Sequence, residues 1–113
     1  MSHSLPFWKS FEHAWNAHDA TSVAAHFEDN ASLTFIDGRQ FAGRSSIRVF
    51  YHETFATMPS DWVHSVLSET ISGSTSHGEL AITAHKNGAE IMTIDYDLQL
   101  SNHGLIRKLI LRK

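Results

Sequence analysis

The stretch ASLTFIDGRQFAGRSSIRVFYHETF, residues 31–55, decides the fold of this chain. Residues 31–36 are rich in β-branched and aromatic side chains and carry few charges, which predicts a strand. Asp37-Gly38 is a turn signal. Beyond Gly43, apolar side chains recur at helical spacing, which predicts a helix over residues 45–57. A strand that meets a helix across a short turn makes a corner, and strands curling around that corner would enclose a pocket under the helix.

Two more helices are predicted before this corner. After Pro6, mostly apolar side chains recur at helical spacing from Phe7 to His18, with polar ones opposite, which predicts an amphipathic helix that ends near Ala17. Asp19 is placed to cap a second helix, and the polar run at residues 28–30 is expected to end it.

After Trp62 the apolar period changes from helical to two, which predicts an antiparallel meander. Residues 73–78 are expected to form a turn, Asn87-Gly88 is a strong hairpin signal, and residues 105–112 are the last predicted strand. The alternation is clearest at residues 92–100, where Met92, Ile94, Tyr96, Leu98 and Leu100 share one face. Such alternation indicates one buried and one solvated face. We therefore expect an α+β fold, with helices covering one face of a strongly curved sheet.

Composition restricts the class of protein. A chain of 113 residues is the size of one domain, and we treat residues 1–113 as a single unit. The formal charge of -3 argues against a nucleic-acid partner. No apolar run reaches the roughly 20 residues that cross a bilayer, so no membrane partner is expected. The first ten residues lack the apolar segment of a signal peptide, which leaves a cytoplasmic location as the expectation.

Four sequence segments together resemble the nuclear-transport-factor-2-like superfamily, including its ketosteroid-isomerase-like and SnoaL-like polyketide cyclase branches. They are F-x-x-x-W-N-A-H-D at residues 11–19, H-F-E-D-N-A at 26–31, G-R-S-S-I-R-V-F-Y at 43–51 and N-H-G-L-I at 102–106. The resemblance covers nearly the whole chain. It implies a cone-shaped α+β fold with three N-terminal helices packed on a strongly curved, mostly antiparallel sheet. It does not imply one function, because this fold carries isomerases, cyclases, dehydratases, hydrolases and non-catalytic binding proteins.

Comparison with the ketosteroid isomerase pattern, position by position, argues against classical steroid isomerisation. Phe11 stands where that family has its oxyanion tyrosine, and Phe35 stands where it has its general-base aspartate. Tyr96, or Asp95 if the hairpin gains a residue, matches the oxyanion-hole acid, and Tyr51 matches the supporting tyrosine. A phenyl ring cannot carry a proton or donate to an enolate oxygen.

Two tyrosines are the main candidates for catalysis. Tyr51 shares a helical face with Ile47 and Phe55, and Tyr96 lies between Ile94 and Leu98 on the apolar face of its strand. Each phenol needs a buried partner or a pocket. If both point into one cavity, they could polarise a carbonyl group. The alternative is that both are core tyrosines whose hydroxyls bond to the backbone.

The expected lining of that cavity is predicted from the helical stripe and the strand alternation. We expect these side chains to share one space: Phe11, Trp15, Phe35, Tyr51, Phe55, Leu67, Ile82, Ile94, Tyr96 and Leu98.

Carboxylates give weaker candidates. Asp95 and Asp97 share one face of a strand, where their proximity could raise one pKa, although a solvated surface is the competing interpretation. The SnoaL-like resemblance implies a catalytic aspartate in this strand, which makes Asp97 a candidate. Asp37 could supply a base at the cavity mouth, or could simply be a turn residue.

No metal or other cofactor is expected. The chain has nine histidines, but no H-x-x-x-H or H-E-x-x-H spacing that would hold a metal ion. There is no cysteine, and therefore no disulfide and no thiol nucleophile.

Three classes of function remain open after this reasoning. The chain could be a cofactor-independent isomerase, cyclase or dehydratase acting on a hydrophobic metabolite. It could instead bind a small hydrophobic molecule without changing it, or use the fold mainly for dimerisation. A homodimer is expected through the outer face of the sheet, to which the alternation assigns a mixed set of side chains: Trp62, His64, Val66, Ala81, Thr83 and His85.

Overall fold

The computed structural model describes residues 6–113, with side chains from residue 8 onward. Over this range the chain forms three helices and six strands. The helices are α1 (Pro6–Asn16), α2 (Ala20–Ala24) and α3 (Arg44–Thr57). The strands are β1 (Phe27–Thr34), β2 (Gln40–Ala42), β3 (Trp62–Ser72), β4 (Thr75–Ala84), β5 (Ala89–Leu100) and β6 (Ile106–Arg112). None of the helices in the described range is long and apolar enough to cross a membrane.

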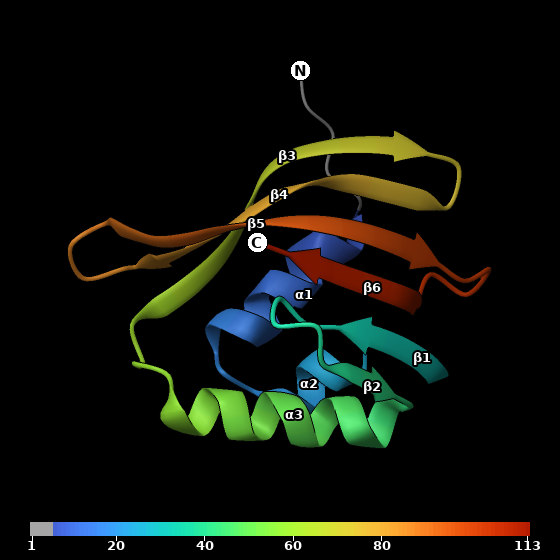
Figure 1. Cartoon of the computed structure of the whole chain (residues 1–113), viewed down its shortest axis with the longest axis horizontal. Helices are drawn as coiled ribbons and strands as arrows, with labels where there is room; N and C mark the ends of the chain where they lie inside the picture. Colours follow the sequence, from blue (N-terminus) through green and yellow to red (C-terminus); the bar gives the residue numbers. More distant parts are fainter. Residues whose placement is uncertain (1–5) are drawn as a thin grey trace.

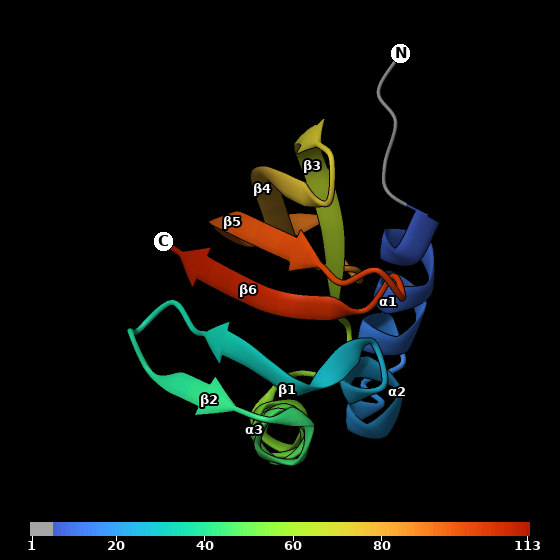
Figure 2. The same cartoon turned by 90° about the vertical axis from the view of Figure 1, so that its right-hand side faces the viewer.

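The strands form one sheet in the order β2-β1-β6-β5-β4-β3 (Figure 1). Only β1 and β6 pair in parallel, so the described sheet is mostly antiparallel and the α+β class is confirmed. The helix α3 packs on α2 and β1, and α1 packs on α2 and β3 (Figure 2). The sheet is not strongly curled, so the expected strong curvature is not confirmed.

Local signals located the helices well and two strand boundaries poorly. Asp19 caps α2 as predicted, because its carboxylate accepts hydrogen bonds from the Ser22 backbone N–H and hydroxyl. The prediction that residues 28–30 end the second helix is wrong, since β1 already begins at Phe27. Their polar side chains are tolerated there because they lie at partly or fully exposed positions of the strand. The predicted turn at residues 73–78 is also too long, because β4 begins at Thr75 and only a tight hairpin separates it from β3.

A β-bulge in β3 reverses the predicted alternation of that strand. Val66 pairs with Leu80 and Ser68 with Glu79, so Leu67 is an extra residue. Leu67 is 54% exposed, and the prediction that it points into the cavity is wrong. Trp62, His64 and Val66, expected on the outer face, instead pack with the core or line the cavity.

The glycine opposite the bulge is required by the close approach of the two strands. Gly78 pairs with Glu69. A Cβ added at Gly78 would lie 2.0 Å from the Ser68 carbonyl oxygen, which no real side chain could do without backbone movement. The bulge and Gly78 therefore form one structural unit, and they turn Glu69 toward the inner face.

The alternation predicted for β5 is confirmed. Tyr96 and Leu98 are buried, and Asp95 is exposed. Tyr96 and Leu98 join the core that fills the space between the helices and the inner face of the sheet.

Candidate functional site

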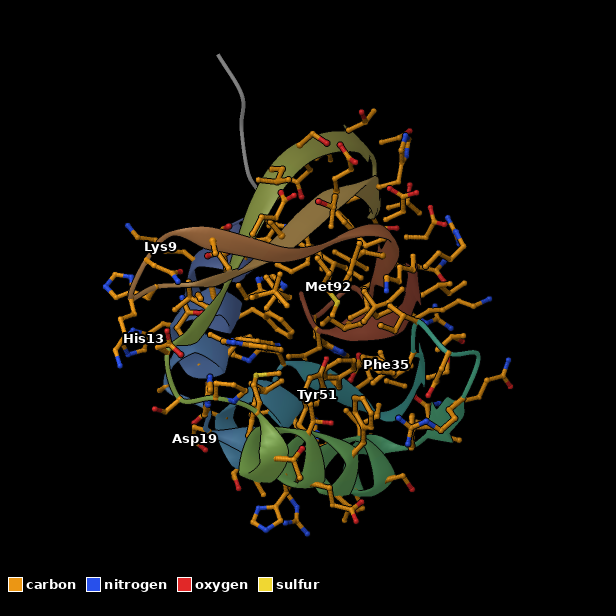
Figure 3. The ribbon with its side chains drawn as sticks, turned by 60° about the vertical axis from the view of Figure 1, so that its left-hand side comes forward. Lys9, His13, Asp19, Phe35, Tyr51 and Met92 are labelled. Carbon is orange, nitrogen blue, oxygen red and sulfur yellow. The ribbon has the colours of Figure 1, made fainter. Side chains whose placement is uncertain are left out.

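A cavity of about 80 Å³ lies between α1, α3 and the inner face of the sheet. Figure 3 shows Tyr51 on α3 and Met92 on β5 facing each other across this space, with Phe35 beside them. The lining consists of Trp8, Phe11, Trp15, Phe35, Phe50, Tyr51, Thr54, Met58, Trp62, His64, Leu80, Ile82, Met92, Ile94, Leu109 and Leu111. Almost all of these are apolar, so a bound molecule would be largely desolvated.

Tyr51 brings one polar atom to this cavity. Its side chain is buried, and its hydroxyl makes no hydrogen bond to any described residue. Among the described residues, every side-chain oxygen or nitrogen that is fully buried has a hydrogen-bond partner. Because the Tyr51 hydroxyl has no such partner, it is not fully buried and must border an unfilled space. Tyr51 lines the cavity, so the cavity is that space. Burial raises the pKa of Tyr51 well above its ordinary value, so the phenol keeps its proton at neutral pH. It is therefore a hydrogen-bond donor available to a ligand.

His64 brings the second polar atom. Its ring is buried between Trp8, Phe11 and Trp15, with ring centroids 5.4–5.8 Å apart. Its Nδ1 lies 3.2 Å from Glu12 Oε2. An ionised carboxylate can only accept, so Nδ1 donates to Glu12 and Nε2 carries the lone pair when the ring is neutral.

The Nε2 atom of His64 has no hydrogen-bond partner among the described residues. By the same reasoning as for Tyr51, it must reach open space, and His64 lines the cavity. The backbone of His64 is held as well, because its N–H donates to Asn16 Oδ1 at 2.8 Å. Two groups from α1, Glu12 and Asn16, thus fix a histidine whose free nitrogen is available inside an apolar cavity.

Six of the predicted lining residues do line the cavity: Phe11, Trp15, Phe35, Tyr51, Ile82 and Ile94. Phe55 is buried behind the lining, where its ring lies 5.3 Å from that of Trp15 and 5.7 Å from that of Tyr51. Leu98 is buried in the same core but does not line the cavity, and Leu67 is exposed because of the bulge.

Tyr96 is buried but does not line the cavity, so the two phenols do not share it. Its hydroxyl lies 2.8 Å from Ser76 Oγ and donates to Glu69 Oε2 at 3.2 Å. Glu69 also accepts from Trp8 Nε1 at 2.6 Å and from Ser76 at 2.9 Å. Burial raises the pKa of Tyr96 to about 12. The surroundings of Tyr96 therefore match the alternative interpretation, a core tyrosine with a satisfied hydroxyl, although the partners are side chains.

The two candidate aspartates lie outside the cavity lining. Asp97 forms an ion pair with Arg112 on the outer face of the sheet. Asp37 accepts hydrogen bonds from Arg39 at its backbone N–H (3.0 Å) and at Nε (2.7 Å). The backbone hydrogen bond from Arg39 holds the pKa of Asp37 below its ordinary value, which makes this carboxylate a weak base.

Sequence reasoning missed His64 and Glu12. The alternation placed His64 outside, and only the bulge brings it inside. Glu12 is one helical turn before Asn16 on α1, which places both on the side of α1 that meets β3. Within residues 6–113, no three side chains of the metal-binding types come together.

Comparisons with solved structures identify the fold. A hypothetical protein with a ketosteroid isomerase-like fold from Catenulispora acidiphila, solved with trimethylamine, matches with a TM-score of 0.81 at 11% identity, covering 98% of this chain and 87% of that one. A candidate polyketide cyclase from Sinorhizobium meliloti matches with a TM-score of 0.77 at 17% identity, covering 96% of this chain and 95% of that one. A candidate SnoaL-like isomerase from Agrobacterium tumefaciens matches with a TM-score of 0.77 at 13% identity, covering 93% of this chain and 92% of that one.

At these identities the likeness establishes the fold alone. No model of a known protein family matches the sequence, and no curated protein matches it. The chain has the fold shared by ketosteroid isomerase-like, SnoaL-like and polyketide cyclase-like proteins, as the sequence resemblance implies.

Proposed function

We propose that this chain binds a small, neutral, mostly apolar molecule with one carbonyl group in its cavity, and catalyses proton transfer on it. The observation that carries the proposal is the Glu12–His64 pair, which leaves the Nε2 atom of a buried histidine free where the cavity is otherwise apolar. A histidine oriented by a carboxylate is a common general base. The proposal is also supported by the unpaired hydroxyl of Tyr51 in the same cavity.

The chemistry follows from the character of each group. His64 Nε2 removes a proton from the carbon next to the carbonyl, and Glu12 stabilises the imidazolium that forms. Tyr51 donates a hydrogen bond to the carbonyl oxygen as negative charge develops there. The proton then returns from His64 to a different carbon, which gives an isomerase, or to a leaving hydroxyl group, which gives a dehydratase.

A volume of about 80 Å³ limits the ligand. Sites for drug-sized ligands usually measure about 300–1,000 Å³. A single small ring is therefore the largest class that we propose for the cavity in this conformation, and a four-ring steroid is excluded. This limit agrees with the phenylalanines that replace the acid and base of the steroid isomerases.

The direct test is exchange of α-hydrogens in D₂O. Cyclohexanone is incubated with the protein, and loss of its α-hydrogen signal is followed by proton NMR. We expect exchange above the buffer rate, reduced about 10²–10⁴-fold by His64→Gln and about 10²–10³-fold by Tyr51→Phe. His52→Gln is the matched control, because His52 is exposed on α3 and should leave exchange unchanged.

A second candidate is a binding protein for a methylated amine. Seven of the described lining residues are Phe, Trp or Tyr, and aromatic rings recognise methylated ammonium groups. The structural neighbour from Catenulispora acidiphila was solved with trimethylamine. Thermal-shift titrations separate the candidates: stabilisation by tetramethylammonium without any ketone exchange supports the binding protein, whereas ketone exchange supports the enzyme.

A further inference from the structure

The cavity has one wall that is held in place from outside by a surface side chain. Of the described lining residues, only Phe35 and Met58 lie outside helices and strands. Phe35 follows the end of β1 and is half-buried, with its ring 4.8 Å from that of Phe50. Its position therefore depends on the connection between β1 and β2 rather than on the sheet.

That connection is a tight loop closed by Arg39 and Asp37. The Phe35 backbone N–H donates to the Arg39 carbonyl at 2.8 Å, and Gly38 N–H donates to the Phe35 carbonyl at 2.9 Å. Asp37 accepts from both the backbone N–H and the Nε of Arg39. These bonds fix the direction in which the Arg39 side chain leaves the loop.

The Arg39 guanidinium lies over three phenylalanine rings. Its central carbon is 5.7 Å from the ring centroids of Phe35 and Phe41, and 5.6 Å from that of Phe50. Cations at this distance are attracted to ring faces. Phe35 and Phe50 also line the cavity, so the guanidinium joins the loop to the wall.

We propose that the Asp37–Arg39 pair sets the size limit of the cavity by holding Phe35 against Phe50, which makes Arg39 a residue that determines ligand size. The inference rests on the proposed function only in assigning this cavity to a ligand. With the pair intact the cavity takes one small ring. When the pair is broken, Phe35 can turn outward and a two-ring molecule can enter.

The test uses benzene and naphthalene, which carry no carbonyl group and so report size without depending on His64 or Tyr51. Their affinities are measured by ligand-observed NMR for the parent chain, Arg39→Gln and Asp37→Asn. We expect each variant to improve naphthalene binding relative to benzene by at least about tenfold, the scale on which apolar pockets discriminate size. Arg48→Gln is the control, because Arg48 is exposed on α3 and forms no ion pair with any described residue.

Two results would overturn the inference. One is a naphthalene-to-benzene affinity ratio that equals the parent's in both variants, measured with variants whose melting temperature also equals the parent's. The other is failure of naphthalene to bind either variant. The variants leave His64 and Tyr51 in place. If they still catalyse ketone exchange and their naphthalene-to-benzene affinity ratio is unchanged, the role of Arg39 and Asp37 in limiting ligand size is rejected and the proton-transfer function is not. If the parent chain shows no ketone exchange above the buffer rate, but the variants have an altered naphthalene-to-benzene affinity ratio, only the proton-transfer function is rejected.

Discussion

Replacing Gly78 with alanine tests the bulge that brings His64 into the cavity. The new Cβ would lie 2.0 Å from the Ser68 carbonyl oxygen and 2.7 Å from the Ser68 carbonyl carbon. The nearer distance is about 1.4 Å short of an ordinary contact. The obstructing atoms belong to the backbone of β3, so no side-chain rotation can relieve the clash, and the two strands must separate.

The cost should lie at the upper end of overpacking penalties, about 3 kcal/mol. For a domain of this size a loss of 1 kcal/mol lowers the melting temperature by roughly 4 °C, so we expect a decrease of about 12 °C. The free energy of unfolding is measured by urea titration, with a thermal melt as the second probe. Glu79→Ala is the control, because Glu79 is the exposed neighbour in the same strand and should change stability by less than about 0.5 kcal/mol.

A loss below about 1 kcal/mol for Gly78→Ala would refute the reasoning. It would mean that the backbones of β3 and β4 lie farther apart at the bulge than a 2.0 Å separation between a Cβ at position 78 and the Ser68 carbonyl oxygen requires. The inward direction of Glu69 and the reversed alternation of β3 would then lose their structural basis.

Three further predictions concern other parts of the molecule. Tyr96→Phe should cost about 1 kcal/mol or somewhat more, because the contacts of its hydroxyl with both Glu69 and Ser76 are lost, while ketone exchange stays at the parent rate; slower exchange would give Tyr96 a role that its position does not suggest. Asp19→Ala should destabilise the chain at neutral pH but progressively less in acid. The Ser22 backbone N–H lowers the pKa of Asp19 in the folded chain. The stabilisation that Asp19 gives is therefore complete above the ordinary aspartate pKa and is lost as the pH falls through the pKa of the folded state. A difference in unfolding free energy between parent and Asp19→Ala that stays constant from pH 7 to about pH 2 would contradict this. The proposed homodimer through the outer face of the sheet should give twice the monomer mass in light scattering at micromolar concentration, although Ala81, one of the side chains expected to be exposed on that face, is buried within the single chain; a strict monomer would count against the dimer.

The sequence predicts regular segments well because their signals are local. The alternation of residues 92–100 correctly buries Tyr96 and Leu98, and Asp19 correctly marks the start of α2. Both depend on side chains that are close in sequence. The same is true of α3, whose predicted and observed ends agree within one residue.

The candidate site was harder to predict because it depends on contacts between distant segments. One extra residue, Leu67, decides whether His64 lies inside or outside, and nothing near it in the sequence marks a bulge except Gly78 on the next strand. Glu12 and His64 are 52 positions apart, so neither identifies the other. Tyr96 was placed on the correct face, but its partners, Ser76 and Glu69, come from strands whose boundaries or alternation were wrong.

The central claim is that the Glu12–His64 pair leaves a lone pair on Nε2 inside a ligand-binding cavity. Long-range ¹H–¹⁵N correlation NMR of the histidine side chains, with His64 assigned through His64→Gln, tests this directly. We predict that the neutral ring of His64 carries its proton on Nδ1 and its lone pair on Nε2, and that cyclohexanone shifts the Nε2 resonance while leaving that of exposed His52 unchanged. A proton on Nε2 of a neutral His64 ring, or an Nε2 resonance that does not respond to saturating ketone, would contradict the account.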